Sequence, residues 1–170
     1  MKIISYSVTQ SVGALTTATA DVLLDTGETL EFGKKVTLSL TTKAPLASAV
    51  DHTIFVGRVS SFTPKYDMPN GGRVYTVTLT SYAYLLNTIP VVTASMTGSV
   101  SSIISTLAAV YGGSSMFSVE SGGPTLTGVV IEENSILKGI ERLAEIANWV
   151  WYVNENGLLM IKPYGEASAG

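Results

Sequence analysis

The period of the hydrophobic pattern changes once along this 170-residue chain, and that change constrains the fold more than any single motif. In the first ninety residues, apolar and hydroxyl side chains alternate with a period of two, most strictly in residues 36–40, Val-Thr-Leu-Ser-Leu. Such alternation is typical of strands with one buried face. Beyond residue 91, apolar residues recur twice at helical spacing. The sequence therefore predicts an α+β fold, with an antiparallel, β-barrel-like first half and two helices in the second.

The first half predicts a run of short strands with turn signals between them. Residues 54–59 and 74–79 form a long antiparallel hairpin in this interpretation, because a loop at 63–73 contains Pro64, Pro69 and Asn70-Gly71-Gly72. Short strands at this spacing indicate a small barrel or sandwich. The predicted strands are 2–8, 18–24, 29–32, 35–41, 53–62 and 74–79.

The second half predicts two amphipathic helices followed by a hairpin. The first helix covers 99–111, with Ser99 as its N-cap and Gly112-Gly113 as its stop. The second covers 135–147, with Asn134 as its cap. Strands are expected at 116–119, 127–131, 149–153 and 158–162, the last two joined by a turn that ends in Asn-Gly. We expect a β-barrel-like domain at 1–90, an α+β domain at 91–163 and a flexible tail at 164–170.

The charge content restricts the partners of the chain. Charged residues make up 14% of the sequence, against roughly 25% in an average soluble domain, and the net charge is −3. Low charge with many small hydroxyl residues favours a chain buried in an assembly; an ordinary Thr-rich β-protein is the alternative. No basic stripe is present that could neutralise phosphates, so we expect no sequence-specific nucleic-acid binding. No apolar run predicts a secretory leader or membrane insertion, so we expect synthesis in the cytoplasm.

The residue types needed for catalysis do not converge in the sequence. His52 is the only histidine and there is no cysteine, which disfavours a catalytic triad and a zinc site. Gly98-Ser99 lacks the second glycine of a nucleophile elbow, and the glycines at 112–113 follow a helix and precede no lysine, unlike a phosphate loop. We therefore expect no enzyme, no cofactor and no metal. An unrecognised hydrolase remains an alternative, for which His52 would be the residue to probe.

Two charged or aromatic groups have both a functional and a structural interpretation. Glu141 and Glu145 lie at i and i+4 on the second helix, which fits a solvated face or one that meets a basic partner. Trp149 and Trp151 share a strand face, and packing the preceding helix is the favoured role for them. The alternative is a carbohydrate- or ligand-binding β-module whose stacking residues are Trp149, Trp151, Tyr82 and Tyr84.

The order of several segments resembles a known family. Residues 54–59, Ile-Phe-Val-Gly-Arg-Val, lead through the long hairpin to residues 80–86, Thr-Ser-Tyr-Ala-Tyr-Leu-Leu. Two helices follow, and then residues 151–159, Trp-Tyr-Val-Asn-Glu-Asn-Gly-Leu-Leu. This order resembles the first barrel of phage tail baseplate hub proteins, the late control protein D family, and their relatives in contractile injection systems. The resemblance covers residues 38–161 and rests on order and spacing, since none of the motifs is a catalytic signature.

The resemblance implies a ring-forming hub in the virion tail, between the tail tube and the spike or tip proteins. Such hubs are often trimers with two similar barrels per chain, whereas this sequence predicts one barrel. It therefore fits either a truncated hub or a smaller tail-tip relative, and its ring could be a trimer or a hexamer through which genome DNA passes. We expect the long loop to contact a neighbour through Pro64, Lys65, Tyr66, Asp67, Met68 and Arg73.

Overall fold

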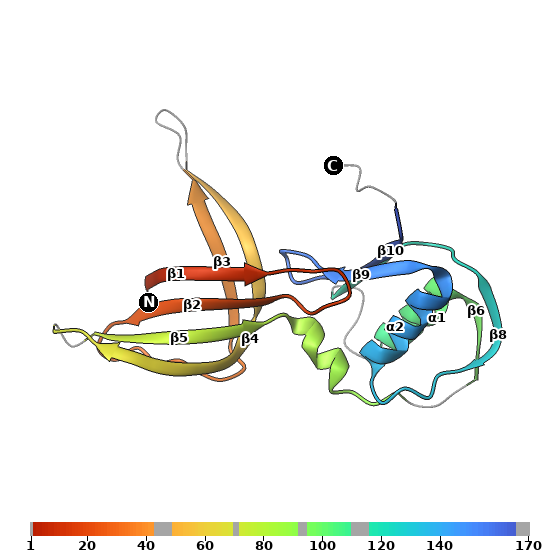
Figure 1. Ribbon diagram of the computed structural model, residues 1–170, viewed down its shortest axis with the longest axis horizontal. Coiled ribbons are helices and arrows are strands. Elements are labelled where there is room, and N and C mark those ends of the chain that lie inside the picture. The colour runs from red at the N-terminus through yellow and green to blue at the C-terminus, as the bar shows by residue number, and fades with distance from the viewer. Residues whose placement is uncertain (1, 43–48, 70–71, 92–94, 110–115, 166–170) are drawn as a thin grey trace. The chain divides into compact units, whose positions relative to one another are not determined.

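The computed structural model describes residues 2–42, 49–69, 72–91, 95–109 and 116–165, which form two compact units (Figure 1). Unit 1 contains Met1–Gln10, Thr16–Tyr82 and Glu155–Gly157. Unit 2 contains Ser11–Leu15, Ala83–Asn154 and Leu158–Gly170. Unit 1 is a curled antiparallel sheet and unit 2 combines helices with small sheets, so the predicted α+β fold is confirmed.

Unit 1 is a five-stranded sheet in the order β1-β2-β5-β4-β3, with every neighbouring pair antiparallel. Its strands are β1 (Lys2–Thr9), β2 (Thr17–Leu24), β3 (Lys35–Thr42), β4 (Val50–Asp67) and β5 (Arg73–Thr80). The sheet is an open half-barrel, because within the described residues β1 and β3 each have a partner on one side only. The alternation expected from the sequence is visible in β2, where every second residue from Ala18 to Leu24 is buried.

The core of unit 1 lies on one face of this sheet, around Phe55 and Val59 of β4. A side chain at Gly57 would collide with this core. A Cβ atom built there would lie 2.4 Å from the carbonyl oxygen of Thr80 and 2.6 Å from Cζ of Phe55. Glycine at this position therefore lets β4 approach β5 while the Phe55 ring fills the space above it.

Two expectations for unit 1 are wrong. Residues 29–32 are not a strand: they belong to the connection between β2 and β3, and in this segment Leu30 packs against the core. The loop predicted at 63–73 is mostly strand, since β4 continues to Asp67 and β5 begins at Arg73. Between the two strands, Met68 N donates to Gly72 O at 2.7 Å.

Unit 2 contains two helices and two small sheets. Its elements are the 3₁₀ helix η1 (Tyr82–Asn87), whose first residue still belongs to unit 1, β6 (Ser95–Ser99), α1 (Val100–Ala109), β7 (Phe117–Val119), β8 (Thr125–Val130), α2 (Ile136–Ala147), β9 (Trp149–Val153) and β10 (Leu159–Pro163). One sheet has the order β7-β10-β9, with β7 parallel to β10, and the other pairs β6 with β8. The predicted C-terminal hairpin is confirmed as β9–β10. Neither η1 nor β6 was predicted from the sequence.

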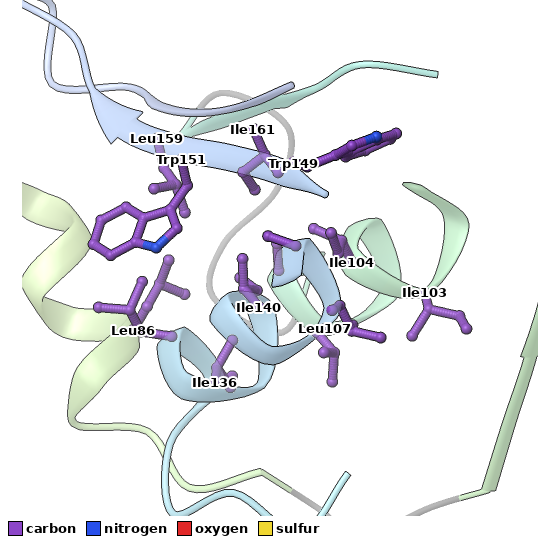
Figure 2. Close-up of a cluster of buried hydrophobic side chains, with 14 of the residues drawn as sticks. Leu86, Ile103, Ile104, Leu107, Ile136, Ile140, Trp149, Trp151, Leu159 and Ile161 are labelled. Carbon is purple, nitrogen blue, oxygen red and sulfur yellow. The ribbon is translucent and has the colours of Figure 1, made fainter. Parts of the chain in front are cut away.

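The core of unit 2 lies between the helices and the three-stranded sheet, as Figure 2 shows. Ile104 of α1 and Ile140 of α2 are fully buried there, together with Leu159 of β10. Trp149 and Trp151 extend from β9 over the helices, so their predicted packing role is confirmed. No helix in the described ranges is both long enough and apolar enough to cross a membrane.

The ends of the two helices are set by serine and asparagine side chains. Ser99 caps α1, because its Oγ accepts from the backbone N of Ser102 at 3.3 Å, as expected. The expected cap of α2 is wrong: Ser135, not Asn134, accepts from Lys138 N. Asn148 ends α2 in the left-handed conformation (φ 56°), which asparagine tolerates better than most residues. The stop predicted at Gly112-Gly113 lies outside the described residues.

Candidate functional site

The candidate site is the exposed periphery of unit 1, built around the long strand β4. The middle of this 18-residue strand is buried in the sheet, whereas both of its ends are exposed. Figure 1 shows the two hairpins that β4 shares, one with β3 and one with β5, at opposite ends of this strand. We call the second hairpin the β4–β5 arm (residues 61–69 and 72–75). In this arm β5 also pairs with β2, with Arg73 opposite Leu24, so only β4 has a free edge among the described strands here.

The β4–β5 arm contains all six residues expected at an interface. Four of them, Pro64 to Asp67, lie in β4, Met68 follows the strand, and Arg73 begins β5. Pro64 is tolerated in the strand because β3 pairs with β4 only as far as Arg58. Beyond that point β4 has one free edge, and a bulge interrupts the register between Pro64 and Tyr66. The arm therefore presents these side chains along and beside a free edge of the sheet, and whether they contact a partner stays a prediction.

One of the six residues, Lys65, is engaged within the chain. Its Nζ donates to Asp21 Oδ2 at 2.7 Å, while Asp21 Oδ1 accepts from the hydroxyl of Thr76 at 2.7 Å. The hydroxyl of Ser5 donates to the same carboxylate at 3.1 Å. The Lys65 and Thr76 hydrogen bonds lower the pKa of Asp21, and Asp21 raises the pKa of Lys65. This carboxylate therefore ties together β1, β2, β4 and β5 at the base of the arm.

The inner side of the arm carries an aromatic pair beside a groove. The rings of Phe62 and Tyr75 meet edge to face, with centroids 6.1 Å apart and planes at 77°. They line a groove of about 380 Å³ together with Leu24 and Arg73. The connection between β2 and β3 forms the other wall of the groove. We call this feature the arm groove.

The two edges of the half-barrel differ in their side chains. β1 exposes Ile3, Ile4 and Tyr6, and a bulge between Ile3 and Ser5 interrupts its pairing with β2. β3 exposes Leu40 and no other large apolar side chain. Exposed edges with apolar side chains are templates for association, and bulges restrict it. Of the two edges, the apolar β1 edge is therefore the more prone to associate with another chain.

The alternative stacking residues are only partly accessible: Tyr84 is exposed and Tyr82 is half-buried. Trp149 is 9% exposed and Trp151 is 5% exposed, so both indoles lie largely in the core of unit 2, although they also line a groove beside the acidic pair of α2. His52 is exposed on β4 opposite Leu40. Within the described residues, no three His, Asp or Glu side chains are grouped so that they could hold a metal ion.

The acidic pair on α2 is neutralised within the helix. Glu141 accepts from Lys138 Nζ at 2.6 Å, and Glu145 lies 3.5 Å from Arg142 Nη1. The Glu141 hydrogen bond raises the pKa of Lys138. Pairs of this kind at i and i+3 support a solvated helix face, so this face does not need a basic partner.

Comparison with known proteins relates the fold to phage tails. No family model matches the chain, and no curated protein matches it. Among solved structures, it is similar to the 43 kDa tail protein of prophage MuSo2 from Shewanella oneidensis, with a TM-score of 0.72 and 15% identity over 96% of this chain. It is also similar to the tail protein from Neisseria meningitidis MC58, with a TM-score of 0.62 and again 15% identity over 96% of this chain.

The sequence identity and the coverage limit what can be inferred from these two structures. At 15% identity the similarities concern the fold alone, and they confirm that the chain has a fold found in phage tail proteins. The chain spans about half the length of both structures, 51% of the first and 48% of the second. The narrower assignment to a baseplate hub stays a prediction.

Proposed function

We propose that this chain is a structural component of a phage tail baseplate or tail-tip hub, forming a ring that joins the tail tube to spike or tip proteins. The observation that carries the proposal is the fold shared with two tail proteins over nearly the whole chain. The proposed role is architectural rather than enzymatic.

The periphery of unit 1 supplies surfaces suited to such a ring. Both ends of β4 and the apolar β1 edge are exposed in the single chain. A charged content of 14% is low for a protein that keeps its whole surface in water. The core of a protein interface is depleted in charged residues, so these surfaces are compatible with contacts around a ring.

The strand order restricts how copies could meet in the ring. Four antiparallel steps separate β1 from β3, so these two edges run in the same direction. Copies related by rotation about an axis along the strands would therefore bring β3 of one copy parallel to β1 of the next. Parallel pairs are slightly less stable per residue, and parallel sheets occur almost only with both faces covered. Side-chain contacts are thus a simpler way to join the copies than a continuous sheet.

Co-assembly tests the proposal directly. The chain would be mixed with the tail-tube and spike proteins encoded beside it, and the mixtures analysed by light scattering and negative-stain electron microscopy. We expect rings of three or six copies, alone or on the end of tube segments. A monodisperse monomer that binds neither the tube nor the spike protein would refute the proposal.

A further inference from the structure

An exposed phenylalanine projects from a firmly held turn of unit 1. Phe32 is 71% exposed, the most exposed aromatic side chain of that unit in the described residues. The turn that carries it is anchored to β4, because Gly33 N donates to Val59 O at 2.9 Å and Val59 N donates to Lys34 O at 3.0 Å. Gly33 has φ +78°, which favours glycine at this bend. The ring is therefore held out in water by the backbone itself.

The arm groove has the size and lining to receive such a ring. Its volume of about 380 Å³ lies within the range of roughly 300–1,000 Å³ typical of binding sites. Leu24 and Leu30 provide apolar walls, and Phe62 and Tyr75 provide aromatic ones. Aromatic rings pair favourably in edge-to-face and offset arrangements, with an added stabilisation of roughly 0.5–1.5 kcal/mol. Phe32 itself does not line the groove.

The charges around the two features are complementary. Asp25 and Glu28 stand on the wall of the groove, with Arg73 among its other lining residues. The phenylalanine is followed in sequence by Lys34 and Lys35, both exposed. Opposite charges at the rim of an interface steer association and fix its orientation. The groove therefore matches an aromatic side chain with a basic flank, which is the pattern at residues 32–35.

The contacts that these charged groups already make within the chain are exposed, including the one from Asp25 N to Glu28 Oε2 at 2.9 Å. Within the chain, Lys34 lies 3.8 Å from Glu31 and Arg73 lies 3.5 Å from Asp67. All four side chains are more than half exposed. Exposed pairs of this kind contribute roughly 0–1 kcal/mol, so exchanging them for contacts with another chain costs little.

We propose that Phe32 of one copy inserts into the arm groove of the next copy. The contact joins two different surfaces of the same chain, so it is heterologous, and such contacts close into rings when the rotation between copies allows it. The proposal deepens the ring-forming role proposed above and rests on it. The parallel direction of β1 and β3 favours side-chain contacts between copies over a continuous sheet, and insertion of Phe32 is such a contact.

Disulfide trapping between two variants tests this contact. The natural sequence has no cysteine, so each variant carries a single thiol. Glu31→Cys places one beside the phenylalanine, and Thr26→Cys places one on the exposed wall of the groove. Mixing the two proteins under mild oxidation should yield the mixed disulfide dimer. Its formation should slow as salt is raised, because the flanking charges are exposed.

Two controls separate a specific contact from random collision. Adding Phe32→Ala to the Glu31→Cys protein should reduce the yield at least tenfold, whereas adding Val12→Ala, which truncates an exposed apolar residue of unit 2, should not change it. Replacing the Glu31→Cys partner by a Tyr164→Cys protein should give no more dimer than free collision. Equal yields with and without Phe32 would overturn the contact. If rings still form on tail tubes in that case, the proposed function stands and only this contact fails.

Discussion

The close approach of β4 and β5 at Gly57 gives the sharpest prediction for unit 1. Gly57→Ala places a methyl group 2.4 Å from the carbonyl oxygen of Thr80 and 2.6 Å from the Phe55 ring. The carbonyl belongs to the backbone of β5, so the clash can be relieved only if β4 and β5 move apart. Overpacking of this kind typically costs about 1–3 kcal/mol. Because the nearest obstacle is backbone, we expect the upper part of this range, about 2–3 kcal/mol.

Urea denaturation followed by far-UV circular dichroism measures this cost. With a slope of about 2 kcal/mol/M, a loss of 2–3 kcal/mol lowers the midpoint by about 1–1.5 M. Ser61→Thr adds one methyl group to the same strand at an exposed position, and it should change the stability by less than about 0.5 kcal/mol. If Gly57→Ala matched this control, β4 and β5 would not approach as closely as described.

The remaining predictions concern a cap, a core residue and the carboxylate beneath the arm. Ser135→Ala should destabilise the chain by about 1–2 kcal/mol in urea titration, whereas Asn134→Ala should not, because only Ser135 caps α2. Ile140→Ala should cost about 2–5 kcal/mol and Ile146→Ala, at a 41% exposed position of the same helix, under 1 kcal/mol; equal losses would contradict the packing. Asp21→Asn should destabilise the chain near neutral pH. A folded pKa lowered below the unfolded value near 3.8 gives stability that is present above that value and lost as pH falls through the folded pKa. The variant and natural proteins should therefore converge in acid, and a constant difference would refute the role of the carboxylate.

Much of the fold could be predicted from local patterns in the sequence. The alternation along β2 and the stripe that includes Ile140 each arise from burial of one face, which leaves a periodic record. The strict alternation of residues 36–40 was a poorer guide, because only Leu38 of β3 is buried and Leu40 is exposed. The Asn-Gly turn between β9 and β10 is a similarly local signal. These features depend on neighbours in the chain, so one sequence suffices to find them.

The features that were missed depend on contacts between distant segments. Pro64 indicated a loop, because a proline in a strand is tolerated only where one edge is free, and that edge is free because β3 pairs no further than Arg58. The interpretation of 29–32 as a strand failed because its alternation is too short to specify a pairing partner. Asn134 and Ser135 are both good capping residues, so the backbone geometry and not the residue type decides which of them caps α2.

The candidate surface was only partly accessible to sequence reasoning. Its six residues were predicted in a loop, whereas four of them lie in β4 and Arg73 lies in β5. The tie between Lys65 and Asp21 joins positions 44 residues apart, so it left no local signal. The exposure of Phe32 could not be predicted either, because a single aromatic residue beside a glycine is as compatible with burial as with exposure. The sequence contained no signal for the arm groove, which arises where the connection between β2 and β3 faces side chains of β4 and β5.

The location of the chain in an assembled particle tests the central claim most directly. Tail particles carrying an affinity tag on this chain would be purified, labelled with gold and imaged by electron microscopy. The account predicts label at one end of the tail, where tube and tip meet, with three or six copies per particle. Label spread along the tube, or particles that assemble fully without the chain, would contradict it.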